Sequence, residues 1–595
     1  MAVGFPEEGE KDWKPAQKRA VYNSDIIYMT NGTIGFDYLL DNLAADADHK
    51  YMRPFNYAIV DEADAVLLDS AVTPLVISGS PRVQSTYTGV ADEIIYTLVR
   101  DVDYEMDEEE DNVWLTNRGI DKIENFLQID DLYDGHHKDQ VRSIELALKA
   151  HFLFEKDEDY VLNKDDEVSL LDKGNGRVMQ GMKLQAGQHQ AIEMKEQVEV
   201  SDDTRAMATI TYQNLFRMFK KLSGMTGTGK AANQEFIESY YVKVVQIPTR
   251  KPVIRKDYPD QIYTTLPEKL QASLDEVKRI HATGRPILLV TATVELSEIY
   301  SELLLREGIP HSVLNARNVA KEAMIIKEAG QMGAVTVATN MAGRGTDIKL
   351  GPGVKELGGL AVIGTEKMAS KRIDQQLRGR AGRQGDPGSS KFFTSLEDEV
   401  VIKCGAHWMH KYYDRHEEER NMAKPKRLRR RKFKRGIQFA QEESDSSNAQ
   451  QRMQSLEMDA SSQIQRELVY QQRNEIIFGT GQIDFDPEKL FRAEFNQFFD
   501  EHQPLTMDQL DRYILDNITY QYFDAPKDLN LHSRHSVVGF LMSLSDHEMA
   551  AKRAEFATAE EADRFIRLSL LKAIDECWID EVDGLEQLRQ AVVAR

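Results

Sequence analysis

The sequence predicts an α/β protein with two sheet-containing lobes, a domain inserted into the first lobe, and an all-α C-terminal part. The first observation is at residues 57–62 (YAIVDE), a short apolar run that ends in two carboxylates, as buried parallel strands do. The second is another apolar run, at residues 334–338, which precedes a glycine- and arginine-rich segment. The third is a change to helical spacing beyond residue 400, where strand patterns end.

Asp61 and Glu62 are candidate catalytic residues. In nucleotide hydrolases an acid at the end of such a strand helps to hold Mg²⁺, and the acid after it positions or activates the attacking water. One alternative is a strand that simply ends at a charged turn, because short motifs also occur without function. A second alternative is an RNA helicase, since residues 61–64 spell DEAD.

Two further motifs occur at residues 338–347 (ATNMAGRGTD) and 375–386 (QQLRGRAGRQGD). Arginine offers a planar donor fork to phosphate, and glycine lets the backbone approach a ligand closely. Arg380 and Arg383 are three residues apart and would share one face of a helix. A solvated basic helix is the alternative, but it would not need glycine at two positions. With the two acids, these motifs predict two RecA-like helicase lobes with ATP between them.

The first lobe is predicted to be interrupted. Residues 1–81 are predicted to be the C-terminal part of the first nucleotide-binding lobe, because residues 20–79 alternate short apolar runs with turns, as α/β units do. Residues 82–205 are predicted to form an inserted domain. Eight acids among residues 101–111 indicate a solvated loop within it. Two later segments, residues 159–162 and 168–171, are predicted to be strands.

The α/β pattern returns at residues 206–232 and continues through a second lobe at residues 233–402. Within that lobe, residues 286–293 (PILLVTAT) predict a buried strand followed by a helix. Residues 403–595 are predicted to be helical, and no Gly or Pro falls between positions 437 and 478. The apolar residues that recur there at helical spacing are Met453, Leu456, Ala460, Ile464 and Leu468.

Residues 224–230 (GMTGTGK) match the G-x-x-x-x-G-K spacing of a phosphate-binding loop. However, Ala231 stands where Ser or Thr would bind Mg²⁺. The segment also follows residues 212–222, which are predicted to be helical, whereas a phosphate loop follows a strand. We therefore expect it to couple the first lobe to the second.

Composition narrows the class of protein. The chain has 595 residues and a net charge of −23, which argues against bulk binding of nucleic acid. Cys404 and Cys577 cannot build a disulfide framework or a zinc site between them, so we expect a reducing, cytosolic setting. The sequence shows no secretory signal and no apolar run of 18 residues.

A basic run interrupts the acidic background. Residues 424–435 (KPKRLRRRKFKR) contain nine basic residues in twelve. A solvated or disordered face is the simple explanation. Clusters of four to eight Lys and Arg also bind anionic lipid headgroups, and this is the functional interpretation that we favour. Binding of RNA or DNA is an alternative.

Longer segments resemble the SecA family, the ATPase motors of bacterial protein export. They are residues 28–42 (YMTNGTIGFDYLLDN), 61–79, 189–193 (HQAIE), 211–216 (TYQNLF), 340–347 and 376–386, and the match extends over almost the whole chain. The resemblance implies that residues 82–205 form a preprotein-crosslinking domain. It also implies that residues 403–595 form a helical scaffold and wing with part of a two-helix finger.

The resemblance also implies roles for individual residues. Asp61 would be the metal ligand that binds Mg²⁺, and Glu62 would position the attacking water. Arg380 and Arg383 would be catalytic arginines that reach the ATP phosphates. The other nucleotide contacts implied are Gly343, Arg344, Gly345, Asp347, Arg378 and Gln384. The implied cofactors are ATP and Mg²⁺, without zinc.

Three departures from the typical family pattern indicate its accessory branch in Gram-positive bacteria, which exports glycosylated serine-rich adhesins. Ser70 and Val72 replace the usual Glu and Arg. The acidic turn of the inserted domain becomes DKGNGR at residues 172–177, and the connection at residues 351–360 is short. A cysteine-rich zinc tail is absent from this sequence.

A larger departure concerns the phosphate loop. The family's adenine-contacting Gln and Gly-Lys-Thr loop precede the Asp-Glu pair, and none of the sixty residues before Asp61 matches them. We therefore expect either a fragment of a longer chain or a natural truncation that does not hydrolyse ATP alone. The chain is also expected to end, at Arg595, before the two-helix finger is complete.

The function expected from the resemblance is that of an ATP-driven motor subunit of accessory Sec protein export. The partners expected are an unfolded preprotein, a SecY-type membrane channel, anionic lipid headgroups, accessory Sec proteins and a second copy of the chain, but not nucleic acid. The location expected is the cytoplasm and the cytoplasmic face of the cell membrane. The alternatives are a non-catalytic scaffold that binds preprotein or channel, and a DEAD-type RNA helicase.

Overall fold

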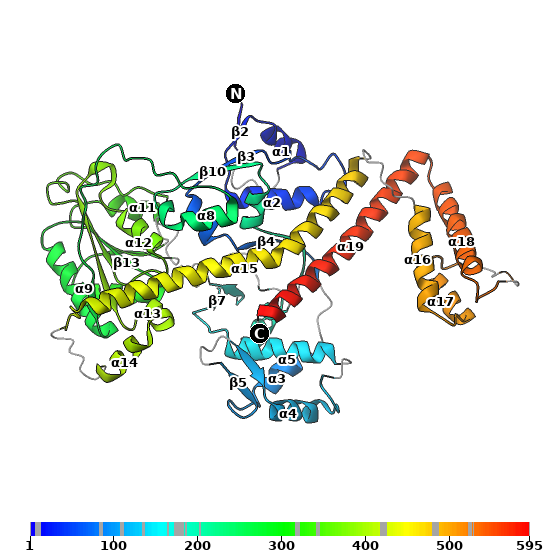
Figure 1. The fold of residues 1–595 in the computed structure, drawn as a ribbon, viewed down its shortest axis with the longest axis horizontal. Coiled ribbons are helices and arrows are strands. Elements are labelled where there is room, and N and C mark those ends of the chain that lie inside the picture. The colour runs from blue at the N-terminus through cyan, green and yellow to red at the C-terminus, as the bar shows by residue number, and fades with distance from the viewer. Residues whose placement is uncertain are drawn as a thin grey trace. The chain divides into compact units, whose positions relative to one another are not determined.

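The computed structural model describes residues 2–5, 13–81, 87–107, 112–133, 137–163, 166–171, 184, 187–201, 204–315, 322–340, 345–416, 425–478, 487–521, 526 and 529–593. The chain divides into two compact units, which are described separately (Figure 1). One unit is Pro54–Asp459 with Gln587–Arg595, and the other is Met1–Arg53 with Ala460–Glu586.

The larger unit contains a seven-stranded sheet in which all strand pairs are parallel. Its strands are β11 (Lys256–Asp257), β12 (Gln261–Tyr263), β13 (Ile287–Thr291), β14 (Ser312–Leu314), β15 (Val335–Thr339), β16 (Leu360–Gly364) and β17 (Gly388–Ser395). Every residue of β13, β15 and β16 is buried. This is the pattern of a parallel sheet covered on both faces, and it confirms the strand predicted within residues 286–293.

Helices cover both faces of this sheet. Alternate residues of β13 enter two different cores, Ile287 and Leu289 one and Leu288 and Val290 the other. Residues of α9 (Leu266–His281) and α10 (Val294–Arg306) pack into the first core. Residues of α11 (Glu322–Glu328) and α12 (Lys371–Arg378) pack into the second. The predicted second α/β lobe is thus confirmed.

The first lobe contributes a smaller sheet. Strand β3 (Tyr57–Asp61) pairs in parallel with β10 (Lys221–Met225), so that Asp61 lies opposite Met225. The prediction of a helix over residues 212–222 is wrong beyond Arg217, where α7 (Tyr212–Arg217) ends. Residues 221–225 pair with the strand that bears the acids, and these long-range hydrogen bonds outweigh local helical spacing. A 3₁₀ turn (Gly229–Ala232) and α8 (Asn233–Tyr240) follow β10.

The inserted region joins the lobe through a long antiparallel pair, β4 (Pro74–Pro81) with β9 (Thr204–Thr211). Two hairpins lie within it, and the second confirms the strands predicted near residues 159–171. The hairpins pair β5 (Tyr104–Met106) with β6 (Val113–Leu115) and β7 (Tyr160–Leu162) with β8 (Val168–Leu170). The helices are α3 (Thr88–Ile95), α4 (Asn117–Leu127), α5 (Lys138–Phe152) and α6 (Gln188–Lys195). Two separate apolar cores hold this region together.

In the described part of the chain after β17, helices replace strands, as predicted. They begin with α13 (Glu399–Cys404), α14 (His407–His416) and α15 (Arg431–Phe478), a helix of 48 residues. The smaller unit holds β1 (Val3–Gly4), β2 (Ile26–Ile27), α1 (Pro15–Tyr22) and α2 (Asn31–Asn42). It also holds α16 (Pro487–Glu501), α17 (Met507–Asn517), α18 (Arg534–Ala554) and most of α19 (Ala559–Val593). Among the described residues, no helix combines the length and apolarity that a membrane span needs.

Candidate nucleotide-hydrolysis site

The two predicted catalytic acids lie where β3 ends. Asp61 is the last residue of the strand and is exposed, and its Oδ1 accepts the backbone N–H of Glu62 at 2.9 Å. Glu62 has a φ of 46°, in the left-handed region that non-glycine residues rarely adopt. Strain of this kind costs about 1–3 kcal/mol and gathers at functional sites, where surrounding structure holds it.

Asp64, two residues beyond Glu62, is the centre of a buried polar network. Its side chain is fully buried and its Oδ2 accepts three hydrogen bonds. Thr228, which follows β10, donates at 2.5 Å. Two residues of α12 in the second lobe also donate, Gln376 at 2.6 Å and Arg372 at 3.1 Å. The loop that bears the acids is therefore tied directly to the second lobe.

Arg372 extends this network to Asp69. Its guanidinium pairs with Asp69 as well as with Asp64, and its side chain is only 6% exposed. Burial opposes the positive charge of Arg372, but Asp69 and Asp64 outweigh that effect, so its pKa is raised. Sequence reasoning missed Asp64, Asp69, Thr228, Arg372 and Gln376, although Asp64 ends the DEAD tetrad and Thr228 lies within residues 224–230.

The loop at residues 224–230 follows a strand, so the argument that it follows a helix is wrong. Three of its polar groups nevertheless donate hydrogen bonds to protein. The backbone N–H of Thr228 donates to Thr226 Oγ1 at 3.1 Å, and Lys230 Nζ donates to Gln246 Oε1 at 3.1 Å. The hydroxyl of Thr228 donates to Asp64. These contacts fit a coupling segment between the lobes better than a phosphate cradle.

The arginines of residues 375–386 do not share a helix face, so that expectation is wrong. Helix α12 ends at Arg378, and Arg380 and Arg383 lie in the turns that follow. Gly382, with φ of 73°, makes this turn possible, and a Cβ there would lie 2.7 Å from Arg255 Cβ. Gly382 and Gly385 have left-handed backbone in the turns after α12, whereas Gly379 is right-handed, so the helical periodicity does not extend to Arg383.

Each arginine of this motif has its own environment. Arg380 is 9% exposed, and its Nη2 lies 3.5 Å from the carbonyl oxygen of Asn340, just after β15. Arg383 Nη1 pairs with Asp347 Oδ1 at 2.7 Å, and both side chains are more than 40% exposed. The structure thus brings the two glycine-rich motifs together.

Arg378 is held by protein partners instead. Its guanidinium donates to Ser390 at 2.8 Å and Asp260 at 3.2 Å, and it stacks over the ring of Phe392 at 4.4 Å. Gln384 is exposed with φ of 54°, and Gly345 has φ of 77°. Gly343 and Arg344 lie outside the described residues.

The side chains present suit a hard cation bound together with phosphate. Mg²⁺ takes oxygen ligands, keeps several waters and needs only one or two carboxylates beside a nucleotide. Asp61 presents an exposed carboxylate at the end of β3. Among the described residues, no cluster of three or more His, Cys, Asp or Glu could hold a metal by itself.

Comparison with known proteins agrees with this geometry. Three family descriptions match along the chain: the SecA DEAD-like domain at residues 2–237, the SecA P-loop domain at residues 252–355 and 352–421, and the SecA wing and scaffold domain at residues 427–595. A protein translocase subunit SecA 2 from Streptococcus sanguinis is 51% identical over 581 residues, which cover 97% of this chain and 73% of that protein. The chain belongs to the SecA family.

Other SecA relatives give the same result. The SecA 2 subunit of Streptococcus agalactiae serotype III is 51% identical over all of this chain and 75% of its own length. That of Staphylococcus aureus strain Newman is 42% identical over all of this chain and 74% of its own length. The expected similarity to accessory SecA proteins is confirmed, as are the α/β lobes and the helical C-terminal part. This member of the SecA family spans about three quarters of these relatives.

Solved structures add little to the assignment. The E. coli DEAD-box protein SrmB matches at 22% identity over 26% of this chain and 84% of that chain, with a TM-score of 0.21. A similarity this low supports no argument about function. Residues 61–64, which spell DEAD, lie within residues 2–237, the part of the chain that matches the SecA DEAD-like domain.

Proposed function

We propose that this chain is an ATP-driven motor subunit of accessory Sec protein export, which couples ATP hydrolysis to the movement of preproteins across the cell membrane. The observation that supports this most directly is the buried network around Asp64. It ties the loop bearing Asp61 and Glu62 to helix α12, which leads into the arginine motif. A motor needs such a connection, because hydrolysis in one place must change the position of another element.

The roles in the site follow from chemistry and position. Bound ATP and Mg²⁺ supply the scissile phosphoryl bond and the charge that polarises it. Asp61 holds the cation, and Glu62 orients the attacking water. Arg380 and Arg383 neutralise charge on the phosphates, with nucleotide contacts from Gly343, Arg344, Gly345, Asp347 and Gln384. Because Arg378 is bound to Asp260, Ser390 and Phe392, we assign it to positioning this motif.

The Arg383–Asp347 pair gives the second lobe a way to respond to nucleotide. Both side chains are exposed, and exposed ion pairs of this kind contribute about 1 kcal/mol or less. A phosphate group offers Arg383 more charge and a bidentate partner. Arg383 can therefore exchange Asp347 for phosphate at small cost, and Asp347 is then released to contact other parts of the nucleotide.

The partners follow from the same assignment. We propose that the inserted region at residues 82–205 holds an unfolded preprotein, with glycosylated serine-rich adhesins as the substrates. The helical C-terminal part would contact a SecY-type channel, and the basic run would contact anionic lipid headgroups. Accessory Sec proteins and a second copy of the chain are further partners, and nucleic acid is not. The working location is the cytoplasm and the cytoplasmic face of the membrane.

A second candidate function, a scaffold that binds preprotein or channel without turnover, is favoured by one observation. Tyr57 and Ile59 of β3 and Met225 of β10 are 54%, 63% and 56% exposed, although parallel sheets are normally covered on both faces. The first-lobe sheet is therefore only partly covered by the described residues. A site that needs a phosphate loop beside this sheet would not hold ATP tightly without it.

Calorimetric titration of the full chain with ATP and Mg²⁺, combined with measurement of phosphate release, distinguishes these functions. For a motor, we expect ATP to bind and be hydrolysed. Glu62→Gln should then lower turnover at least about 100-fold while ATP still binds, since it removes only the group that activates water. Glu302→Gln, at an exposed side chain of α10, is the control and should change neither ATP binding nor ATP turnover. Absence of ATP binding would refute the motor and leave the scaffold.

A further inference from the structure

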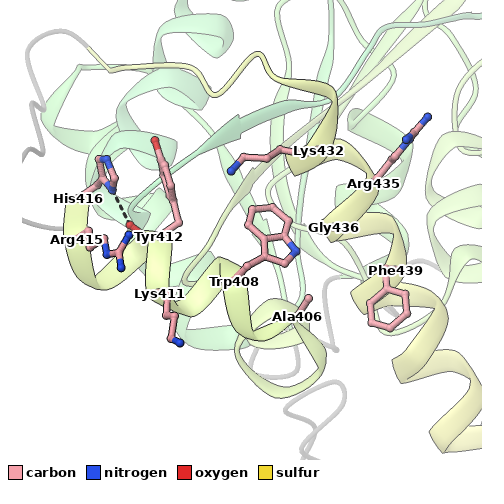
Figure 2. A pocket seen from close by; sticks show the side chains of 10 residues that line it. All are labelled: Ala406, Trp408, Lys411, Tyr412, Arg415, His416, Lys432, Arg435, Gly436 and Phe439. Carbon is pink, nitrogen blue, oxygen red and sulfur yellow. Dashed lines mark hydrogen bonds between the residues drawn. The ribbon is translucent and has the colours of Figure 1, made fainter.

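A groove of about 740 Å³ lies between α14 and the first turns of α15, and none of its lining residues belongs to the motifs of the nucleotide site (Figure 2). Its floor is aromatic. Trp408 and Tyr412 project from α14, and Phe439 projects from α15 and is 50% exposed. The size is within the range that binds ligands or the side chains of a peptide.

The two helices approach closely at this groove because position 436 is glycine. A Cβ at Gly436 would lie 2.6 Å from Met409 Sδ and 2.9 Å from Trp408 Cζ2. Phe433, three residues before Gly436 in α15, is 2% exposed. Its ring centroid lies 5.5 Å from that of Trp408 and 4.8 Å from that of Tyr412. The aromatic floor is thus fixed by a packed core beneath it, so the groove is preformed.

The rim of the groove is basic. Lys411 and Arg415 extend from α14, and Lys432 and Arg435 extend from α15 (Figure 2). No Asp or Glu is among the described residues that line it, although the chain as a whole has a net charge of −23. Lys432 lies 4.7 Å from the Trp408 ring centroid, so one cation is already placed over the floor.

We propose that this groove binds an acidic peptide segment of a partner protein. Carboxylates of the segment pair with Lys411, Arg415 and Arg435, and one aromatic or apolar side chain packs on Trp408 beside Phe439. Arg clusters recognise acidic motifs in this way. Aromatic anchors supply most of the affinity in such contacts, while rim charges set the rate of association and the choice of partner.

A groove fits a peptide better than it fits the two other polyanions. A bilayer presents a broad surface that would meet the rim charges but would not reach an aromatic floor between two helices. A nucleic acid carries a charge at every phosphate, and the acidic chain would repel it well beyond the groove. A short peptide brings a few charges to the rim, and its central side chain enters the hollow.

The test is binding of a fluorescein-labelled nine-residue peptide, in which Asp and Glu surround one central Trp, to the full chain by fluorescence anisotropy. We expect Lys411→Glu/Arg435→Glu to weaken binding about tenfold, because two favourable ion pairs become repulsive. The matched control is Lys426→Glu/Arg429→Glu, which makes the same charge change at two residues of the basic run that do not line the groove. This control should change the dissociation constant less than about twofold.

Two further arms keep the result specific. Phe439→Ala should weaken binding of the Trp-containing peptide but should not weaken binding of a peptide with Ala at its centre. Only the Trp-containing peptide contacts the aromatic floor of the groove. Binding of phosphatidylserine vesicles and of polyuridylate to the same variants is also measured. The folding of each variant is checked by circular dichroism. If either variant fails to fold, the corresponding Gln substitutions take its place. Equal loss in both double variants, or groove-dependent binding of vesicles or polyuridylate without peptide binding, would overturn the proposal.

Discussion

Buried charges in the second lobe occur as mutually satisfied groups. Lys269 and Asp398 are 2.6 Å apart with side chains only 2% and 1% exposed, and Ser395 also binds Asp398. Glu366 lies in the same environment and accepts the backbone N–H of Ala292 at 3.0 Å. Burial raises the pKa of Glu366 to about 7, against the opposing charge of Lys269 and with a contribution from Asp398. Such groups link stability to pH.

Glu366→Gln should alter the pH dependence of stability. The pKa of Glu366 in the folded chain is above its ordinary value of 4.5. The stability that Glu366 contributes is therefore fully present below pH 4.5, and it is lost as the pH rises through about 7. The loss amounts to about 3 kcal/mol at most. Gln does not ionise, so the variant should gain stability relative to the parent between pH 5 and 8.

Urea unfolding followed by circular dichroism at pH 5, 6, 7 and 8 measures this gain. Glu302→Gln, at a side chain that is 64% exposed, is the control and should leave the pH profile unchanged. A difference between Glu366→Gln and the parent that is constant over this pH range would contradict the prediction.

At the scale of elements, packing determines where helices begin and end. The predicted helical stretch without Gly or Pro begins at residue 437, whereas α15 begins at Arg431 and passes through Gly436. Glycine disfavours a helix interior, but here it allows α14 to approach, as its contacts with Met409 and Trp408 show. Conversely, α12 ends at Arg378 because the turn after it contains left-handed backbone at Gly382 and Gln384.

Gly436→Ala should therefore destabilise the chain although alanine is the better helix former. The added methyl group would overlap Met409 and Trp408, and overpacking of this kind costs about 1–3 kcal/mol. The matched control is Gly539→Ala in α18, where an added Cβ meets nothing within 4 Å. This control substitution should stabilise the chain by about 0.5–1 kcal/mol. Thermal unfolding of both variants tests this contrast, and equal shifts in the same direction would refute it.

At the scale of the molecule, the two lobes are coupled through α12. Asp64 and Asp69 come from the segment after β3, and Arg372 comes from the second lobe, yet the three side chains form one cluster, in which Asp64 and Arg372 are buried and Asp69 is partly buried. A buried pair contributes little net stability over an apolar alternative, but breaking it leaves an uncompensated charge. The cluster therefore specifies how the lobes meet more than it stabilises either one.

Arg372→Ala should cost about 3–5 kcal/mol of stability, because it removes the cation that pairs with the buried carboxylate of Asp64 and the partly buried carboxylate of Asp69. Asp69→Asn in the same chain should recover part of that loss, so the two changes should not be additive. Urea unfolding and ATP turnover of the single and double variants measure the coupling. Arg306→Ala, in a pair with both side chains more than 60% exposed, is the control and should shift stability by less than about 1 kcal/mol. Additive effects of Arg372→Ala and Asp69→Asn would disprove the coupling.

Local pattern in the sequence was enough to determine the α/β lobes, the helical C-terminal part, the resemblance to SecA, and the place of Asp61 and Glu62 at the end of a strand. These features depend on periodicity and on short motifs, which are local. Tertiary structure alone decided that residues 221–225 form a strand, that Arg378 turns toward Asp260, and that Asp64 meets Arg372 more than 300 residues away. Those outcomes depend on pairing between distant segments, and no local pattern of residues specifies which distant partner a side chain meets.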